Sequence, residues 1–298
     1  MAKKKAKEKI KKQMEEFIEE EDQQFGSGLI LPKKGFDFKD VESMIMDVDD
    51  IPLYLSILLY GKNGSGKTRF AGTCPNPMVF DFRERGTLTI RGTGAKVVKI
   101  RTVDMLEQFF WYLATQKHPF QTVVFDTVTQ MNDISLKSIM GVDQWEVGDA
   151  VQMAHKRHYG ENTQLMKFWI MNFRDIENMH KVFLCQQKTL NDEDIDEESF
   201  EVVPALSDAV SKSLCAAVDI IAQLNIKEVA VEGTSKVKSI YRARVGPSER
   251  YSTKFRIPAN SEVKVPMFIK DPSFDKFMGY YEQIGKETVN NGKGKKQG

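Results

Sequence analysis

The chain has 298 residues, of which 41% are apolar and 29% are charged. This composition excludes a wholly disordered chain, and the length is typical of one large domain or two small ones. Lys and Arg number 43 against 42 Asp and Glu, so the net charge of +1 excludes a uniformly basic nucleic-acid-binding protein and leaves only local patches. The 3 widely spaced cysteines exclude a disulfide framework and a zinc module. No apolar run is long enough to span a membrane, and no signal-peptide pattern follows the basic N-terminus, so we expect a soluble, cytoplasmic protein.

The first segment, residues 1–28, is rich in lysine and then in acidic residues. Ile10, Met14, Phe17 and Ile18 fall on one helical stripe, which predicts a charged helix followed by a linker. Such a helix either frays in solvent or docks on a neighbouring subunit or on its own core.

The main domain that we predict, residues 29–284, alternates short strands with longer helical patterns, which indicates an α/β fold with a mostly parallel sheet flanked by helices. The predicted strands are Ser56–Tyr60, Met78–Phe82, Val97–Ile100, Thr122–Asp126, Val182–Gln186 and Ile220–Leu224. The predicted helices are Thr68–Gly72, Val103–Thr115, Val128–Met140 and Asn162–Met179. Three further strands, Ile226–Val231, Val237–Val245 and Lys254–Ile257, predict an antiparallel extension toward the C-terminus. Residues 285–298 are rich in Gly, Lys and Asn, which predicts a disordered basic tail.

A phosphate-binding loop stands out in this pattern. The run Gly61, Lys62, Asn63, Gly64, Ser65, Gly66, Lys67 and Thr68 matches G-x-x-x-x-G-K-[ST] in full. It follows an apolar strand and precedes a helix, the context in which this motif cradles a triphosphate with backbone N–H groups. Lys67 is then expected to reach the β- and γ-phosphates of ATP, and Thr68 to offer its hydroxyl to Mg²⁺.

A second strand supplies a carboxylate for the metal. Four strand-forming residues from Thr122 end in Asp126, at the carboxyl edge where open α/β sheets bind ligands. We therefore expect Asp126 to hold a water on Mg²⁺.

The accessory motifs narrow the class of P-loop protein. The guanine-reading N-K-x-D and the transporter-type L-S-G-G-Q are absent from the sequence. Between Leu55 and Tyr281, the order of parts resembles the RecA-type ATPase core, most closely the phage-encoded RecA-like ATPases of single-strand annealing and recombination.

Three local matches carry this resemblance and imply site residues. The run Met78–Gly86 resembles the strand with the catalytic Glu, although Arg83 stands where Glu is expected, so Glu84 is the candidate and Asp81 the reserve. Val182–Lys188 resembles the sensor strand, which makes Gln186 a γ-phosphate sensor. Tyr251–Arg256 resembles the Lys-x-Arg element that acts on a neighbouring subunit's ATP, which assigns that role to Lys254 and Arg256.

DNA-binding residues are sought in the loop regions after the two central strands. In the first, residues 141–163, the cluster Lys156, Arg157, His158 and Tyr159 combines cations with an aromatic ring, which suits phosphate attraction and base stacking. A helix with a polar face explains the same pattern. The second region, residues 188–203, is strongly acidic and would repel a polyanion, and further basic candidates are Arg242, Arg244, Arg250 and the two lysine-rich ends.

The leading hypothesis is therefore a Mg²⁺- and ATP-dependent, single-strand-DNA-binding RecA-like ATPase. The resemblance implies a homo-oligomeric ring or filament with ATP bound between subunits, and an ATPase activity that DNA stimulates. It also implies that the protein works with phage replication or recombination proteins in the host cytoplasm, without a membrane. The alternatives are a hexameric helicase-like translocase or loader, and a P-loop switch or kinase without a DNA role, which the near-zero net charge and the acidic segment favour.

Overall fold

The computed structural model describes residues 45–142, 153–191, 200–230, 237–259 and 261–294. The chain divides into two units, Met1–Pro52 and Leu53–Gly298, and the boundary at residue 28 that the composition indicates stays a prediction. Of the first unit, the structure describes residues 45–52, which include the short 3-10 helix η1 (Val48–Asp50). The helix expected within residues 1–28 lies outside the described residues.

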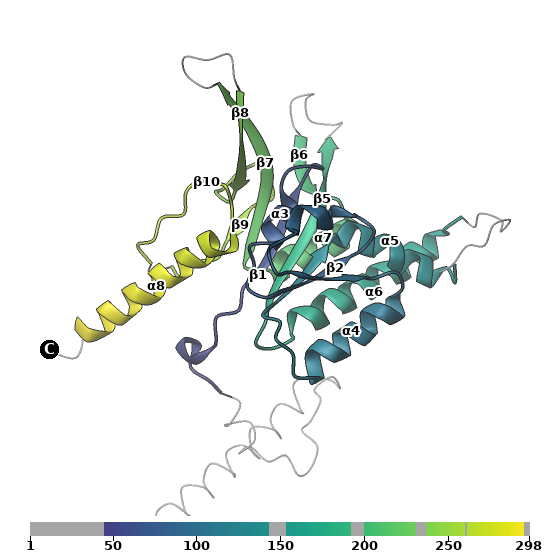
Figure 1. Ribbon diagram of the computed structural model, residues 1–298, viewed down its shortest axis with the longest axis horizontal. Helices are drawn as coiled ribbons and strands as arrows, with labels where there is room; N and C mark the ends of the chain where they lie inside the picture. Colours follow the sequence, from purple (N-terminus) through teal and green to yellow (C-terminus); the bar gives the residue numbers. More distant parts are fainter. Residues whose placement is uncertain (1–44, 143–152, 192–199, 231–236, 260, 295–298) are drawn as a thin grey trace, which may run out of the picture. The chain divides into compact units, whose positions relative to one another are not determined.

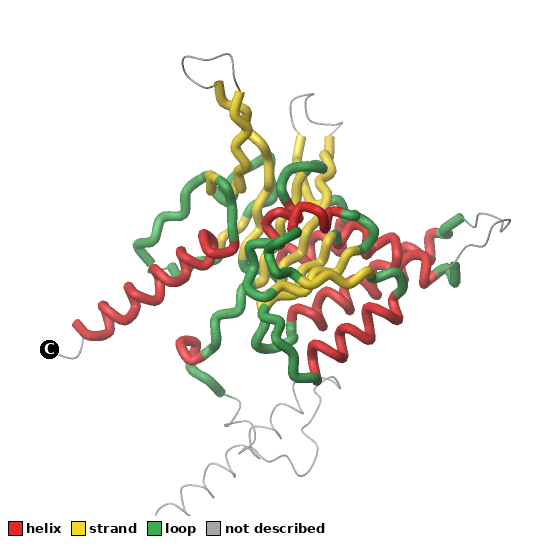
Figure 2. The backbone as a smooth tube through the Cα atoms, viewed as in Figure 1, coloured by secondary structure: helices red, strands yellow, loops and turns green. Residues whose placement is uncertain are grey.

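The second unit is built on one large sheet. The described strands, drawn as arrows in Figure 1 and in yellow in Figure 2, follow the order β10-β8-β7-β1-β5-β4-β2-β3, with β6 beside β5 and β9 beside β7. Their bounds are β1 (Ser56–Gly61), β2 (Pro77–Asp81), β3 (Lys96–Lys99), β4 (Thr122–Asp126), β5 (His180–Asn191), β6 (Phe200–Pro204), β7 (Ile220–Ala230), β8 (Val237–Arg244), β9 (Lys254–Phe255) and β10 (Phe268–Lys270). The run from β7 to β3 is parallel, and β6, β8, β9 and β10 pair antiparallel. The α/β class and the antiparallel C-terminal extension are confirmed.

Helices cover both faces of this sheet (Figure 1). One face packs against α4 (Val103–Thr115), α5 (Val128–Ile139), α6 (Lys156–Arg174) and α7 (Asp208–Ala217). The other face packs against α3 (Lys67–Ala71) and α8 (Phe274–Gly294). A further 3-10 helix, η2 (Gly86–Ile90), contacts α3. No helix in the described part of the chain is both long and apolar enough to span a bilayer.

Burial on both faces explains why the central strands are continuous apolar runs. In β1 every residue is buried, with Leu58 and Tyr60 in the core under α4–α7, and Ile57 and Leu59 in the core under α3 and α8. The first core is rich in aromatic rings. Phe125 of β4 meets the ring of Phe173 edge-on, with the two centroids 4.9 Å apart.

Two elements differ from the expectation in the C-terminal half. The strands expected at 220–224 and 226–231 form one strand, β7, which pairs with β8 from Gln223 to Ala230. No Gly or Pro interrupts this stretch, so the hairpin extends the strand beyond the core. The helix α7 was not expected, because only Val210 and Leu214 of its residues are buried and its apolar stripe is correspondingly short.

Two helix ends also differ from the expectation. The helix expected from Asn162 begins at Lys156, so residues 156–161 are helical rather than part of a loop. At the other end of the chain, α8 continues to Gly294, so residues 285–294 are helical where the composition had predicted disorder. Local composition is a weak guide in both places, because each helix is held by core residues elsewhere along its length, such as Met166 in α6 and Phe277 in α8.

His180, the first residue of β5, links the sheet to the chain that enters it. Its Nδ1 accepts a hydrogen bond from the backbone N–H of Leu55 at 2.9 Å, and the ring is 7% exposed. Burial, with a smaller contribution from the positive charge of Lys181, lowers the pKa of His180 to about 4. The neutral imidazole is therefore the form that the fold stabilises.

We predict that this histidine makes the fold sensitive to acid. The folded pKa lies below the ordinary 6.5, so the unfolded chain binds the proton more tightly and stability is lost as the pH falls from about 6.5 to about 4. Between pH 7 and pH 5 the loss attributable to His180 is about 2 kcal/mol. Urea unfolding of the wild type and of His180→Asn at both pH values measures it. The Asn variant keeps an acceptor for Leu55 and should show a smaller loss, whereas equal losses would contradict the assignment.

Candidate nucleotide-binding site

The phosphate-binding loop joins the end of β1 to the start of α3, and its glycines are required by close contacts or by positive φ values. A Cβ on Gly61 would lie 2.5 Å from the carbonyl oxygen of Leu224 and 2.7 Å from Oγ of Ser65. Gly64 and Gly66 have φ values of +78° and +98°, which side chains disfavour. The loop is thus a tight backbone turn packed against β7.

Lys67 is buried within this loop. Its Nζ donates to the carbonyl oxygens of Gly61 at 2.9 Å and Lys62 at 3.0 Å, and it lies 3.5 Å from Oε1 of Gln186. Burial lowers the pKa of Lys67, and the negative charges of Glu84 and Asp126 act in the opposite direction. The ammonium group is therefore held at the position where the motif places a triphosphate.

Thr68 and Asp126 meet beside it. The Thr68 hydroxyl donates to Oδ2 of Asp126 at 2.8 Å. Burial raises the pKa of Asp126 to about 6, against the lowering effect of this hydrogen bond. A hydroxyl and a carboxylate at hydrogen-bond distance are the hard oxygen donors that Mg²⁺ prefers, so these two side chains fit the metal of a Mg-nucleotide complex.

The structure separates the two candidate carboxylates, Asp81 at the end of β2 and Glu84 beyond it. Oε1 of Glu84 accepts hydrogen bonds from the Thr127 hydroxyl at 3.0 Å and from Nε2 of Gln186 at 3.0 Å. Asp81 instead faces Arg101, with Oδ2 lying 3.7 Å from NH2. Glu84 therefore belongs to the cluster around Lys67, and Asp81 is engaged in a separate ion pair.

The backbone after β2 explains how Glu84 reaches the site. Arg83 and Arg85 have positive φ values of 81° and 55°, so the chain turns sharply there. Strand alternation, which would place Glu84 on the face opposite Arg83, does not apply beyond the end of β2 at Asp81.

Gln186 bridges Lys67 and Glu84. Its position follows from the register, because Gly61 of β1 pairs with Gln186 of the parallel strand β5. Its backbone N–H donates to the Thr129 hydroxyl at 3.1 Å, and Thr127 contacts Glu84. Sequence reasoning missed these two threonines of the β4–α5 junction, although the Thr that follows Asp126 is the signal that could have drawn attention to them.

Lys254 and Arg256 lie away from this cluster. The residues of β9 pair with Ile220 and Ile221 at the start of β7, the opposite edge of the sheet from the loop. Lys254 Nζ donates to the carbonyl oxygen of Cys215, and Arg256 NH2 donates to that of Ala216 at 2.8 Å. The two side chains share a face, as their spacing predicts, and within their own chain they cap the C-terminal end of α7. A role on a neighbouring subunit's nucleotide stays a prediction.

The four residues expected to bind DNA occupy the first turn of α6 rather than a loop. Arg157 pairs with Glu161 at 2.6 Å, and His158 Nδ1 accepts from the backbone N–H of His155 at 3.2 Å. Lys156 and Tyr159 are solvent-exposed. Their DNA contacts also stay a prediction, because intrahelical partners already engage two of the four.

A cavity of about 540 Å³ adjoins the phosphate-binding loop on the β7 side. Lys62 and Asn63 line it from the loop, and Phe200 and Tyr251 supply aromatic walls. Guanidinium groups lie over both rings: Arg250 is 4.9 Å from the Phe200 centroid, and Arg244 is 5.0 Å from that of Tyr251. The surface beside the loop is thus both cationic and aromatic.

Comparison with known proteins bears on the same region. A family model described as an AAA domain matches residues 53–257, which include the loop, Asp126, Glu84 and Gln186. A search of the curated proteins finds no match.

We predict that Gly66→Ala destabilises the loop far more than Gly64→Ala. A Cβ on Gly66 would lie 2.9 Å from Cδ1 of Tyr241, whereas one on Gly64 meets nothing within 4 Å. Both substitutions carry the cost of positive φ, about 1 kcal/mol, so the difference isolates the clash with Tyr241. Urea unfolding and nucleotide binding of the two variants measure it. Equal effects of the two substitutions would show that Tyr241 yields without cost.

Proposed function

Because the chain belongs to the AAA domain family of P-loop ATPases, we propose that its site binds ATP with Mg²⁺ and hydrolyses it to drive the binding of single-stranded DNA. The observation that carries the proposal is the contact series from Lys67 through Gln186 and Glu84 to Thr127. This series joins the loop that would hold phosphate to a carboxylate suited to activating water.

Each member of the site has a separate task in this proposal. Lys67 stabilises the charge that develops on the transferred phosphoryl group, and the loop's backbone N–H groups hold the phosphates. Glu84 orients the attacking water and accepts its proton. Thr68 and Asp126 would hold Mg²⁺, which when bound neutralises phosphate charge.

Gln186 is suited to sensing the γ-phosphate. Its amide contacts Lys67 on one side and Glu84 on the other, so loss of the phosphate would change both contacts. The next residue, Gln187, lines the cavity beside the loop, and its Oε1 accepts a hydrogen bond from Nε2 of Gln223 at 3.2 Å. Gln186 therefore faces the nucleotide site, whereas its neighbour Gln187 faces the cationic, aromatic surface, as alternation along a strand requires.

That surface supports single-stranded DNA as the partner. The guanidinium groups of Arg242 and Arg244 both lie over the ring of Phe268, 4.4 Å and 4.5 Å from its centroid. Cations interleaved with aromatic rings suit backbone phosphates and stacked bases. The RecA-like, phage-type character, the ring or filament with Lys254 and Arg256 acting between subunits, and the replication or recombination partners belong to the same proposal and rest on the sequence resemblance.

We predict that Lys67→Ala removes tight nucleotide binding. The substitution deletes the ammonium group that the loop carbonyls hold in place, and with it the charge that compensates the phosphates. Isothermal titration calorimetry with ATP and Mg²⁺ should show at least a tenfold loss of affinity, while circular dichroism stays unchanged. Wild-type affinity in the variant would contradict the site.

We predict that Glu84→Gln keeps nucleotide affinity and lowers turnover by about 10²-fold, because the amide still accepts from Thr127 but cannot accept the proton of water. Asp81→Asn is the matched carboxylate control. It should lower stability through the loss of the Arg101 pair, with less effect on turnover per folded molecule. If Asp81→Asn abolished turnover and Glu84→Gln did not, the catalytic assignment would be reversed.

We predict that Arg244→Ala weakens the binding of a single-stranded oligothymidylate and reduces the slope of log affinity against log salt by about one. Fluorescence anisotropy over a salt series measures both quantities. Lys96→Ala, an exposed cation at the amino end of β3, is the control and should leave both unchanged. No detectable retention of the oligonucleotide by the wild type at low salt would refute a DNA-binding function.

A further inference from the structure

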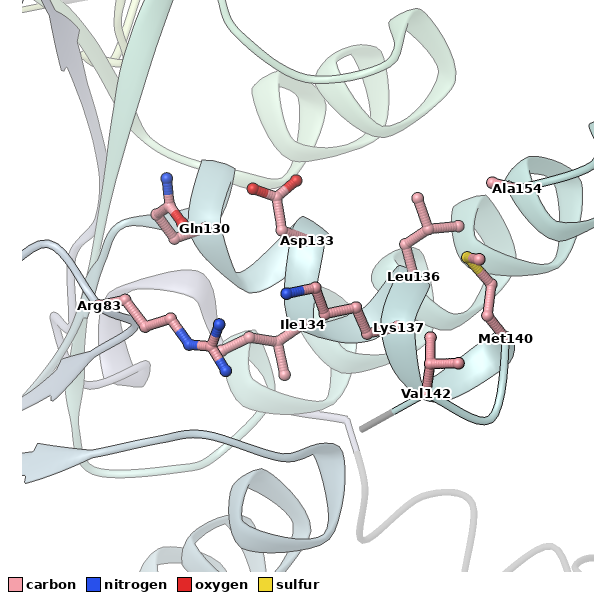
Figure 3. A pocket seen from close by; sticks show the side chains of 9 residues that line it. All are labelled: Arg83, Gln130, Asp133, Ile134, Leu136, Lys137, Met140, Val142 and Ala154. Carbon is pink, nitrogen blue, oxygen red and sulfur yellow. The ribbon is translucent and has the colours of Figure 1, made fainter. Parts of the chain in front are cut away.

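A second cavity, of about 270 Å³, lies between Arg83 and α5 (Figure 3). The Arg83 side chain extends toward α5, whose Asp133 and Lys137 also line the cavity. Ile134 and Met140 provide apolar lining. None of these residues has a role in the nucleotide site described above.

The charges of this cavity favour an anion. Within the described residues, the side chains of Arg83 and Lys137 make no hydrogen bond and no ion pair, although both act electrostatically on Asp133. Two cations and one carboxylate leave a net charge of +1 when all three are ionised. Guanidinium donors that lack a partner form a fork suited to the oxygens of a phosphate group.

The cavity is connected to the nucleotide site through both of its walls. Arg83 directly precedes Glu84, and the positive φ of Arg83 sends the two side chains in different directions. On the other side, α5 begins after Thr127, which donates to Glu84 and accepts from the backbone N–H of Gln130. Gln130 in turn lines the cavity. A ligand that draws Arg83 toward Lys137 would therefore pull on the segment that positions the Glu84 carboxylate.

We propose that the cavity between Arg83 and α5 binds a phosphate group, and that Arg83 is a positioning residue that transmits this binding to Glu84. The regulatory part rests on the proposed ATPase function, whereas the binding part does not. The phosphate can belong to the backbone of a single-stranded nucleic acid or be free in solution. The apolar lining from Ile134 and Met140 would suit the sugar of a nucleotide unit.

The binding part is tested in the full chain with Lys67→Ala, which empties the phosphate-binding loop of competing anions. Calorimetry with inorganic phosphate, and separately with a short oligothymidylate, compares Lys67→Ala with chains that also carry Arg83→Gln or Lys137→Gln. We expect each added substitution to weaken binding of at least one probe by about tenfold. Adding Lys96→Gln instead is the control and should change neither affinity.

The regulatory part is tested by turnover in chains with Lys67 intact. Arg83→Gln should retain basal turnover within about twofold and lose its response to the probe that binds, and Arg83→Lys should restore part of that response. A structural role alone would lower basal turnover and leave the response ratio unchanged.

The outcomes of these experiments distinguish a nucleic-acid phosphate from free phosphate, and the binding site from the ATPase function. If Arg83→Gln or Lys137→Gln weakens binding of the oligonucleotide only, the ligand of the cavity is a nucleic-acid phosphate, and if it weakens binding of inorganic phosphate, the ligand is a free anion. Failure of both probes to bind the Lys67→Ala chain, or identical affinities with and without Arg83→Gln and Lys137→Gln, would overturn the proposal. An inactive wild type would refute the ATPase function while calorimetry still decided the binding site.

Discussion

The parallel pairing of β1, β5, β4 and β2 is the constraint on which the site depends. Parallel strands bring their carboxyl ends to one edge, and the register aligns Gly61 with Gln186 and Asp81 with Asp126. Residues more than 100 positions apart thereby come into contact, as when Nε2 of Gln186 donates to Oε1 of Glu84 at 3.0 Å. Helices on both faces maintain this register, because a slip by one residue would exchange the side chains of the two buried cores.

The charged side chains of the site are buried away from water, which lowers the pKa of the cation and raises the pKa of the carboxylate. Burial disfavours the charged form of Lys67 and of Asp126, so each shifts toward neutrality. Their mutual attraction, together with the Thr68 hydrogen bond, works against those shifts. A bound metal and polyphosphate would supply the missing compensation, which is the physical reason that such a cluster fits a charged ligand better than it fits a purely structural role.

The surfaces beside the site are organised around it. On the β7 side, Arg244 and Tyr251 belong to an aromatic and cationic wall next to the phosphate-binding loop. On the α5 side, Arg83 extends from the residue before Glu84 into a separate cavity. Strand β5 and the β4–α5 junction run between these surfaces and the nucleotide site. Events at the γ-phosphate position and at either surface can therefore be coupled through short, packed segments.

The phosphate-binding loop, the alternation of strands and helices and the strand that ends in Asp126 could be predicted from the sequence alone, because each depends on local spacing of glycines and apolar residues. The placement of Glu84 beside Gln186, and of Asp81 beside Arg101, came from the fold, since left-handed backbone at Arg83 and Arg85 breaks the alternation that a sequence argument must assume. The fold also revealed Thr127 and Thr129, and it gave Lys254 and Arg256 partners at the end of α7. Such contacts join segments distant in the chain, and their geometry is set by packing that no local pattern encodes.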